Sequence, residues 1–121
     1  MTTDKQRWDG ALNLIRTFGV QIAPNVNSCC AGCIDEAKDL PVGWDQEAPY
    51  IFWLRTQGRA IKFDEYGRFY RPEKPRRFLS WQNMTTVQIS AVCLMLRDSG
   101  LDVTVPKDSN HAIEINFGGT A

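Results

Sequence analysis

The sequence is poor in features that many functions require, since it has one histidine, no net charge and no long hydrophobic run. The single histidine, His111, excludes mechanisms that need two, and no P-loop, dinucleotide-binding turn or Ser-His-Asp order is present. Lys+Arg and Asp+Glu are both 14, so the general positive charge typical of nucleic-acid-binding proteins is missing. The longest apolar run, residues 91–96, is far shorter than the roughly 20 residues of a membrane-spanning helix. Enzymatic activity stays open but is the less favoured interpretation, and no membrane partner is expected.

The length of 121 residues fits one domain with a single core, and we expect only residues 1–4 and 118–121 to fray. The first residues lack the apolar region of a signal peptide, which predicts a cytoplasmic protein, in the host cytoplasm if the protein is phage-encoded. Thiols are normally kept reduced there, so the four cysteines are poor evidence for a disulfide framework.

Two helices are predicted, each opened by a capping box in which a threonine and a glutamine satisfy each other's free amides. Thr3 and Gln6 precede a helix over residues 5–18, and Thr85 and Gln88 precede a helix over residues 86–99. The second helix is so apolar that we expect deep burial, including the row formed by Val87, Ala91 and Leu94.

The strands are predicted from apolar runs between turn residues. Residues 50–54 are apolar on both faces and indicate a central strand, which a turn at Gly58 would pair with residues 60–63 as a hairpin. Further strands are expected at 20–22, where Pro24 would end the first, and at 101–105 and 111–117. Residues 71–77 contain two prolines and are expected to be irregular, and residues 34–40 form at most a helical turn or two. The predicted fold is a single α+β domain, with an antiparallel or mixed sheet of about four to five strands and two main helices packed on it.

Three of the four cysteines, Cys29, Cys30 and Cys33, fall within five residues. The spacing of Cys30 and Cys33 would allow both thiolates to reach one zinc ion, although a second such pair is missing. A redox pair is another interpretation, because a turn that opens a helix lowers a thiol pKa. Simple packing is the third and favoured interpretation, so no cofactor is expected and zinc remains an alternative. Cys93 is expected to be a small core residue.

Residues 53–81 form a basic-aromatic segment with eight basic and three acidic residues, a local balance of +5. Arginines and lysines can neutralise phosphates while exposed aromatic rings stack on bases. The candidate binding residues for nucleic acid or another partner are Arg68, Arg71, Lys74, Arg76 and Arg77. The opposing interpretation, which we favour, is that the aromatic side chains pack in the core and the charges are solvated.

The order of motifs resembles an uncharacterised domain family of actinobacteria and their relatives. The matching stretches include the Cys-Cys-x-x-Cys motif at residues 29–33, the aromatic strand at 50–52, Tyr66-Gly67, and the helix that runs into Gly100-Leu101-Asp102-Val103. The resemblance implies a small accessory protein of bacterial or phage type with no known activity. We therefore expect a non-enzymatic accessory protein that binds another macromolecule, most often a protein. The alternatives are a nucleic-acid binder through residues 55–81, and a thiol-redox or metal-binding protein through Cys30 and Cys33.

Overall fold

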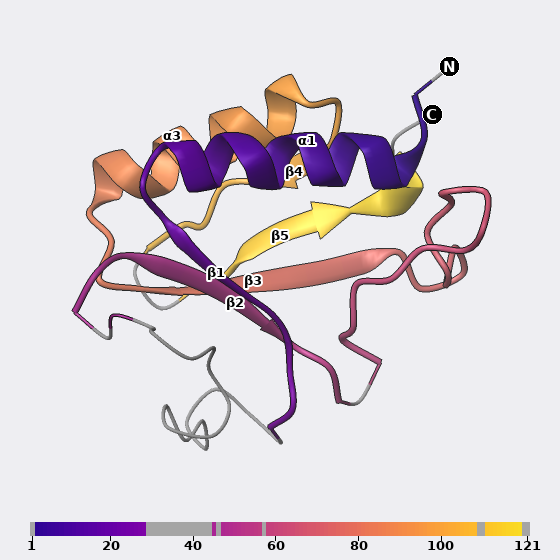
Figure 1. Ribbon diagram of the computed structural model, residues 1–121, viewed down its shortest axis with the longest axis horizontal. Coiled ribbons are helices and arrows are strands. Elements are labelled where there is room, and N and C mark those ends of the chain that lie inside the picture. Colours follow the sequence, from indigo (N-terminus) through magenta and orange to yellow (C-terminus); the bar gives the residue numbers. More distant parts are fainter. Residues whose placement is uncertain (1, 29–44, 46, 57, 109–110, 120–121) are drawn as a thin grey trace.

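The computed structural model describes residues 2–28, 45, 47–56, 58–108 and 111–119, which form a five-stranded sheet with two helices on one face (Figure 1). The elements in chain order are α1 (Asp4–Thr17), β1 (Gln21–Val26), β2 (Tyr50–Leu54), β3 (Arg76–Gln82), α3 (Thr86–Asp98), β4 (Asp102–Thr104), β5 (Ile113–Asn116) and the short 3-10 helix η2 (Phe117–Gly119). The predicted α+β class, with two main helices and a mixed sheet, is confirmed. Neither α1 nor α3, nor any other helix among the described residues, has the length and hydropathy that a membrane span requires.

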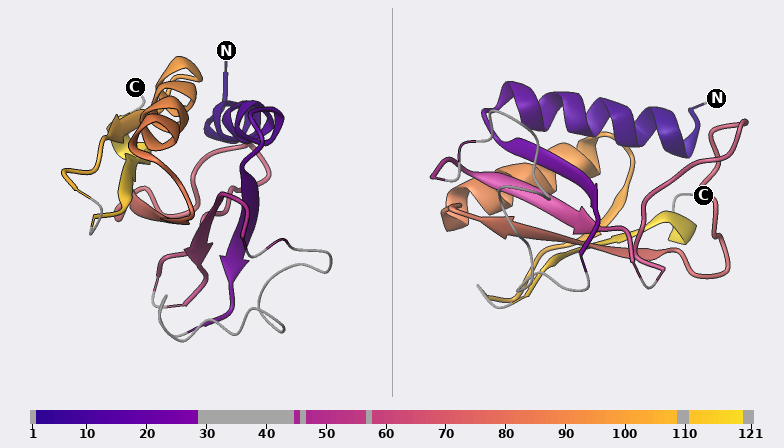
Figure 2. Two further views of the ribbon diagram at one scale, coloured as in Figure 1. Left: turned by 90° about the vertical axis from the view of Figure 1, so that its left-hand side faces the viewer. Right: turned by 60° about the horizontal axis from the view of Figure 1, so that its bottom comes forward.

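The sheet has the strand order β1-β2-β3-β5-β4. β1 runs parallel to β2, and every other neighbouring pair is antiparallel. The helices α1 and α3 lie side by side and run in opposite directions across the same face of this sheet (Figure 1; Figure 2). The two edges of the sheet are therefore β1 and the three-residue β4.

Both helices begin as the sequence predicts. Thr3 and Thr85 accept a hydrogen bond from the backbone amide three residues ahead, and the glutamines at those positions bond back, so both capping boxes are present. Each helix is followed by a glycine with positive φ, 99° at Gly19 and 95° at Gly100, where a side chain would be strained.

The main core lies between the helices and the sheet. It contains the α1 row Trp8, Leu12 and Ile15, and it contains Val92 and Leu96 of α3. The sheet contributes its inward-facing strand residues, among them Ile51, Leu79, Ile113 and Ile115, which are fully buried. A second, smaller cluster consists of Ala23, Val26, Tyr50, Phe52 and Leu54. β2 contributes alternate residues to both clusters, which confirms that it is apolar on both faces.

The expected end of the first strand at Pro24 is wrong, because β1 continues to Val26. Pro24 is tolerated because β1 is an edge strand, where a missing amide donor need not interrupt a ladder. The pairing with β2 shifts register between Ala23 and Val26, and Asn25 adopts a positive φ of 48° there.

The expected hairpin between residues 50–54 and 60–63 is also wrong. β2 pairs with β3 instead, with Ile51 opposite Trp81. Ile61 is held by Asn25, whose side chain accepts a hydrogen bond from the Ile61 amide (2.9 Å) and donates one to its carbonyl (3.3 Å). The backbone amide and carbonyl of Ile61 are therefore bound to a side chain from β1, while the Lys62 carbonyl accepts a hydrogen bond from the Tyr70 amide.

β3 begins at Arg76, inside the segment 71–77 that the sequence indicates is irregular. Pro72 and Pro75 both precede the strand, so neither removes a donor from its ladder. The side chains of β3 that face inward are Arg77, Leu79 and Trp81. Because Arg77 is charged, the sequence does not show the alternation of apolar and polar residues that is typical of a strand.

The orientation of α3 differs from the expected one. Its buried residues are Ile89, Val92, Cys93 and Leu96, whereas Val87 and Leu94 face outward. The helix therefore packs through one apolar row and leaves the other at the surface. The expected turn at residues 34–40 lies outside the described residues.

Candidate functional site

The candidate cysteines Cys29, Cys30 and Cys33 lie outside the described residues, so packing, metal binding and redox activity all stay predictions for them. The described residues contain no group of three His, Cys, Asp or Glu side chains that could hold a metal ion. Cys93 is a core residue, as predicted, with 1% of its surface exposed. Burial raises the pKa of its thiol, against the opposing charge of Arg97. A neutral, buried Cys93 is a poor nucleophile.

Arg77, one of the candidate binding residues, is buried inside the fold with 3% exposure. Its Nε donates to the carbonyl of Ala60 (2.8 Å), and its Nη1 donates to the carbonyls of Lys74 (2.8 Å) and Arg76 (2.6 Å). The guanidinium also lies over the Phe69 ring, 4.8 Å from its centroid. Arg77 therefore connects β3 to the preceding loops and presents no charge to a partner.

The other candidate bases occupy different surroundings. Arg71 forms an ion pair with Glu73 (3.2 Å). The pKa of the Glu73 carboxyl is lowered most by a hydrogen bond with its own backbone amide, and next by the hydrogen bond with Arg71. Arg68, Lys74 and Arg76 are exposed. The structure thus leaves three of the five candidate residues as accessible cations, of which Arg68 lies over the exposed Tyr66 ring, 6.0 Å from its centroid.

The aromatic residues of the same segment divide in a similar way. Phe69 is buried, and Tyr70 and Trp81 pack against the main core, whereas Phe78 is half-exposed on the outer face of β3. Phe78 lies opposite Glu114 of β5, so an acidic side chain flanks the one aromatic ring of β3 that could stack on a base.

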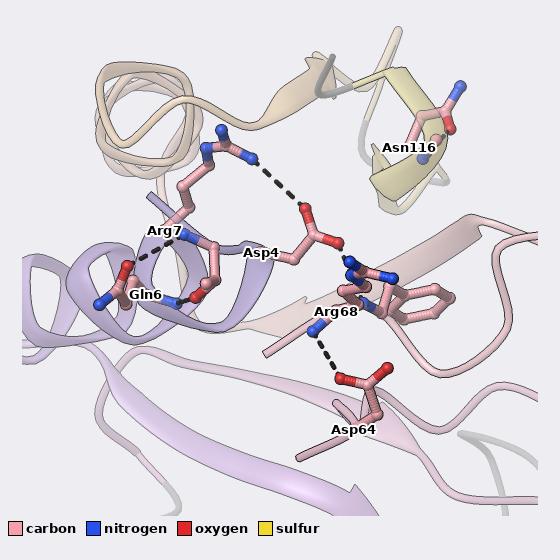
Figure 3. A network of polar contacts seen from close by, with 9 residues as sticks. Asp4, Gln6, Arg7, Asp64, Arg68 and Asn116 are labelled. Carbon is pink, nitrogen blue, oxygen red and sulfur yellow. Dashed lines mark hydrogen bonds and ion pairs between the residues drawn. The ribbon is translucent and has the colours of Figure 1, made fainter. Parts of the chain in front are cut away.

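A polar network connects the start of α1 to the loop at residues 64–69 (Figure 3). The Asp4 carboxylate accepts hydrogen bonds from Arg7 Nη1 (3.3 Å) and from the Phe69 amide (2.9 Å), and the Lys5 amide donates to the Gly67 carbonyl (3.0 Å). A hollow of about 440 Å³ adjoins it, lined by residues of both charges that include Asp4 and Arg68. Because the Asp4 oxygens bind the protein's own donors, this network serves to hold the loop on the helix.

Four large apolar side chains are exposed on the helices, and we call them the helix-pair patch: Leu14 (48% exposed), Phe18 (44%), Val87 (76%) and Leu94 (57%). Arg7 marks the flank of α1 that faces α3, because a Cβ at Gly100 would lie 3.1 Å from its Cδ. Leu14 and Phe18 lie seven and eleven residues after Arg7, and therefore on that same flank. On α3, Val87 and Leu94 lie seven residues apart and form a row on the side of the helix opposite its buried residues.

A cavity of about 490 Å³ lies where β3 ends and α3 begins. Its walls are Trp81, Met84 and Ile89 on one side and the residues 105–108 that follow β4 on the other. This cavity could not be predicted from the sequence, because its lining comes from two segments that only the fold brings together.

A scan of protein-family models, a search of curated proteins and a search of solved structures found no match to this chain. The resemblance to the actinobacterial family therefore stays a hypothesis that the motifs alone support.

Proposed function

We propose that the protein acts by binding another protein through the helix-pair patch. The observation that supports this proposal is the exposure of Leu14, Phe18, Val87 and Leu94 on two adjacent helices. Single exposed apolar residues are common, but several on one face are typical of an interaction site. α1 and α3 pack against the sheet through other residues, among them Ile15 and Leu96, and the main core includes none of the four patch side chains.

The alternative of nucleic-acid binding receives less support. Of the five candidate bases, Arg77 is buried and Arg71 is paired, which leaves Arg68, Lys74 and Arg76. Arg76 lies opposite Asn116 of β5, which in turn lies opposite Asp102 of β4, so the row that contains Arg76 also contains an acidic side chain. The metal and redox alternatives concern residues outside the described ones and stay predictions.

The proposal is tested by site-specific photo-crosslinking in the cells from which the chain originates. A benzophenone amino acid at position 94 is expected to capture a defined protein partner, whereas the same group at Arg16, an exposed residue of α1, is the matched control. The double variant Leu14→Gln and Val87→Gln should abolish capture at position 94 while the purified variant keeps its circular dichroism spectrum, because both side chains are exposed.

Equal capture at positions 94 and 16, or capture that survives the double variant, would contradict the proposal. A crosslinked product of twice the chain mass would identify a second copy of the chain as the partner, which sedimentation over a range of concentrations would check.

A further inference from the structure

The cavity at the start of α3 has the dimensions of a small-molecule site. Its volume of about 490 Å³ lies within the range of roughly 300–1,000 Å³ that is usual for such pockets. The cavity is distinct from the helix-pair patch, because none of the four patch residues lines it. A ligand here would therefore contact none of the four residues proposed to bind a protein partner.

One side of the cavity is apolar and includes the flat indole ring of Trp81. Trp81 and Met84 are only partly buried although they pack against the main core, and Ile89 completes this wall. Val105, on the opposite side, is 40% exposed. An indole ring beside two flexible or branched aliphatic side chains favours a planar apolar group over a hydrated ion.

The rim of the cavity is polar and has one accessible cation. Lys107 is exposed, and no carboxylate pairs with it in the described part of the chain. Asp108 also lines the rim, but its Oδ1 lies 2.7 Å from Nδ1 of His111 and is directed toward that ring. Ser90 adds a hydroxyl from α3. The first turn of α3 contains no acidic side chain, so nothing there opposes the partial positive charge of the helix start.

We propose that this cavity binds a small amphipathic carboxylate. Its planar apolar body lies against Trp81 and Ile89, and its carboxylate lies near Lys107. A bare inorganic anion would leave the apolar wall in contact with water, and a neutral planar molecule would leave Lys107 without a partner. The combination of an apolar wall with a single cation at the rim therefore selects a ligand that has both parts.

The test uses 2-naphthoate as the probe, with 2-naphthamide and inorganic phosphate as comparison ligands, in titrations followed by amide and indole NMR signals. We expect 2-naphthoate to shift the Trp81 indole signal and the amides of residues 85–90 and 105–108. The variant Lys107→Met should weaken this binding about fivefold, the effect of one partly solvated charge pair, and leave 2-naphthamide binding unchanged. Lys5→Met, on the exposed side of α1, is the matched control and should change neither.

Three results would overturn the proposal: no shift of the Trp81 signal at millimolar 2-naphthoate, equal affinity for 2-naphthamide in the unmodified protein, or the same shifts with phosphate alone. Ser90→Phe, which places a ring in the cavity, should abolish 2-naphthoate binding. Because Lys107 is exposed, its variant is expected to fold normally, and it decides the matter even if Ser90→Phe does not fold.

Discussion

Two leucines on α3 provide a matched test of how this helix packs. Leu96 has no exposed surface, whereas Leu94, two residues earlier, is 57% exposed. The sequence predicts burial for both, so the substitutions Leu96→Ala and Leu94→Ala distinguish the observed orientation of the helix from the expected one. We expect Leu96→Ala to be strongly destabilising and Leu94→Ala to be nearly neutral.

The magnitudes follow from the surface that each side chain buries. Leu→Ala removes three carbon groups, and at about 0.8 kcal/mol each this is about 2.4 kcal/mol for a fully buried side chain. The cavity left at Leu96, which lies within the main core, raises the expected loss to about 3–5 kcal/mol. Less than half of Leu94 is covered, so its loss should be about 1 kcal/mol or less, and the higher helix propensity of alanine reduces it further.

The assay is urea unfolding followed by far-ultraviolet circular dichroism at several protein concentrations. With a slope of about 1.5 kcal/mol per molar urea, Leu96→Ala should lower the midpoint by about 2–3 M and Leu94→Ala by less than about 0.7 M. Equal losses for the two variants at low protein concentration would show that Leu94 is covered within the monomer. That result would refute both the observed orientation of α3 and the helix-pair patch.

Other predictions concern residues whose surroundings are unusual. Arg77→Lys should lower the free energy of unfolding in urea by about 2–4 kcal/mol, because lysine cannot donate hydrogen bonds to all the carbonyls that Arg77 binds. Arg76→Lys on the exposed side should be neutral, and equal effects of the two substitutions would contradict the buried role of Arg77. Gly67→Ala should lower the melting temperature, since Gly67 has a φ of 78° and a Cβ would lie 2.7 Å from the Thr3 hydroxyl; an unchanged melting temperature would contradict this packing. Cys93 should alkylate only as the protein unfolds. The free energy of unfolding should fall as pH rises above about 8.5, because the thiol ionises in the unfolded chain while its raised pKa keeps it protonated in the folded protein, and Cys93→Ala should remove this part of the pH dependence. Elemental analysis of protein purified without added metal should find no stoichiometric zinc, and one zinc per chain would favour the metal interpretation of the cysteine motif.

The parts of the fold that follow from local chemistry could be predicted from the sequence. Thr3 with Gln6, and Thr85 with Gln88, determine the helix starts through contacts three residues apart, which a sequence displays directly. β2 was recognisable because a strand buried on both faces has no polar position.

The parts that failed depend on contacts between distant residues. Asn25 binds the backbone of Ile61, 36 residues later, and β2 pairs with β3, so Ile61 does not join the hairpin that its composition favours. Arg77 occupies a core position of β3 because the carbonyls of Ala60 and Lys74 satisfy its charge, and no local pattern shows that those acceptors are near. The cavity near Lys107 escaped prediction for the same reason.

The two errors at Arg77 and Leu94 are opposite in kind, and comparing them supports the proposed function. A charged residue was expected outside and lies inside, where hydrogen bonds and the Phe69 ring compensate for the loss of water. An apolar residue was expected inside and lies outside, and within the described residues its surface remains more than half uncovered. The fold thus supplies the partners that the buried charge requires but supplies no cover for Leu94 or for Val87 on the same helix. A partner that covered these two side chains would remove their apolar surface from water, which is why the proposed function makes α3 the first place to look for one.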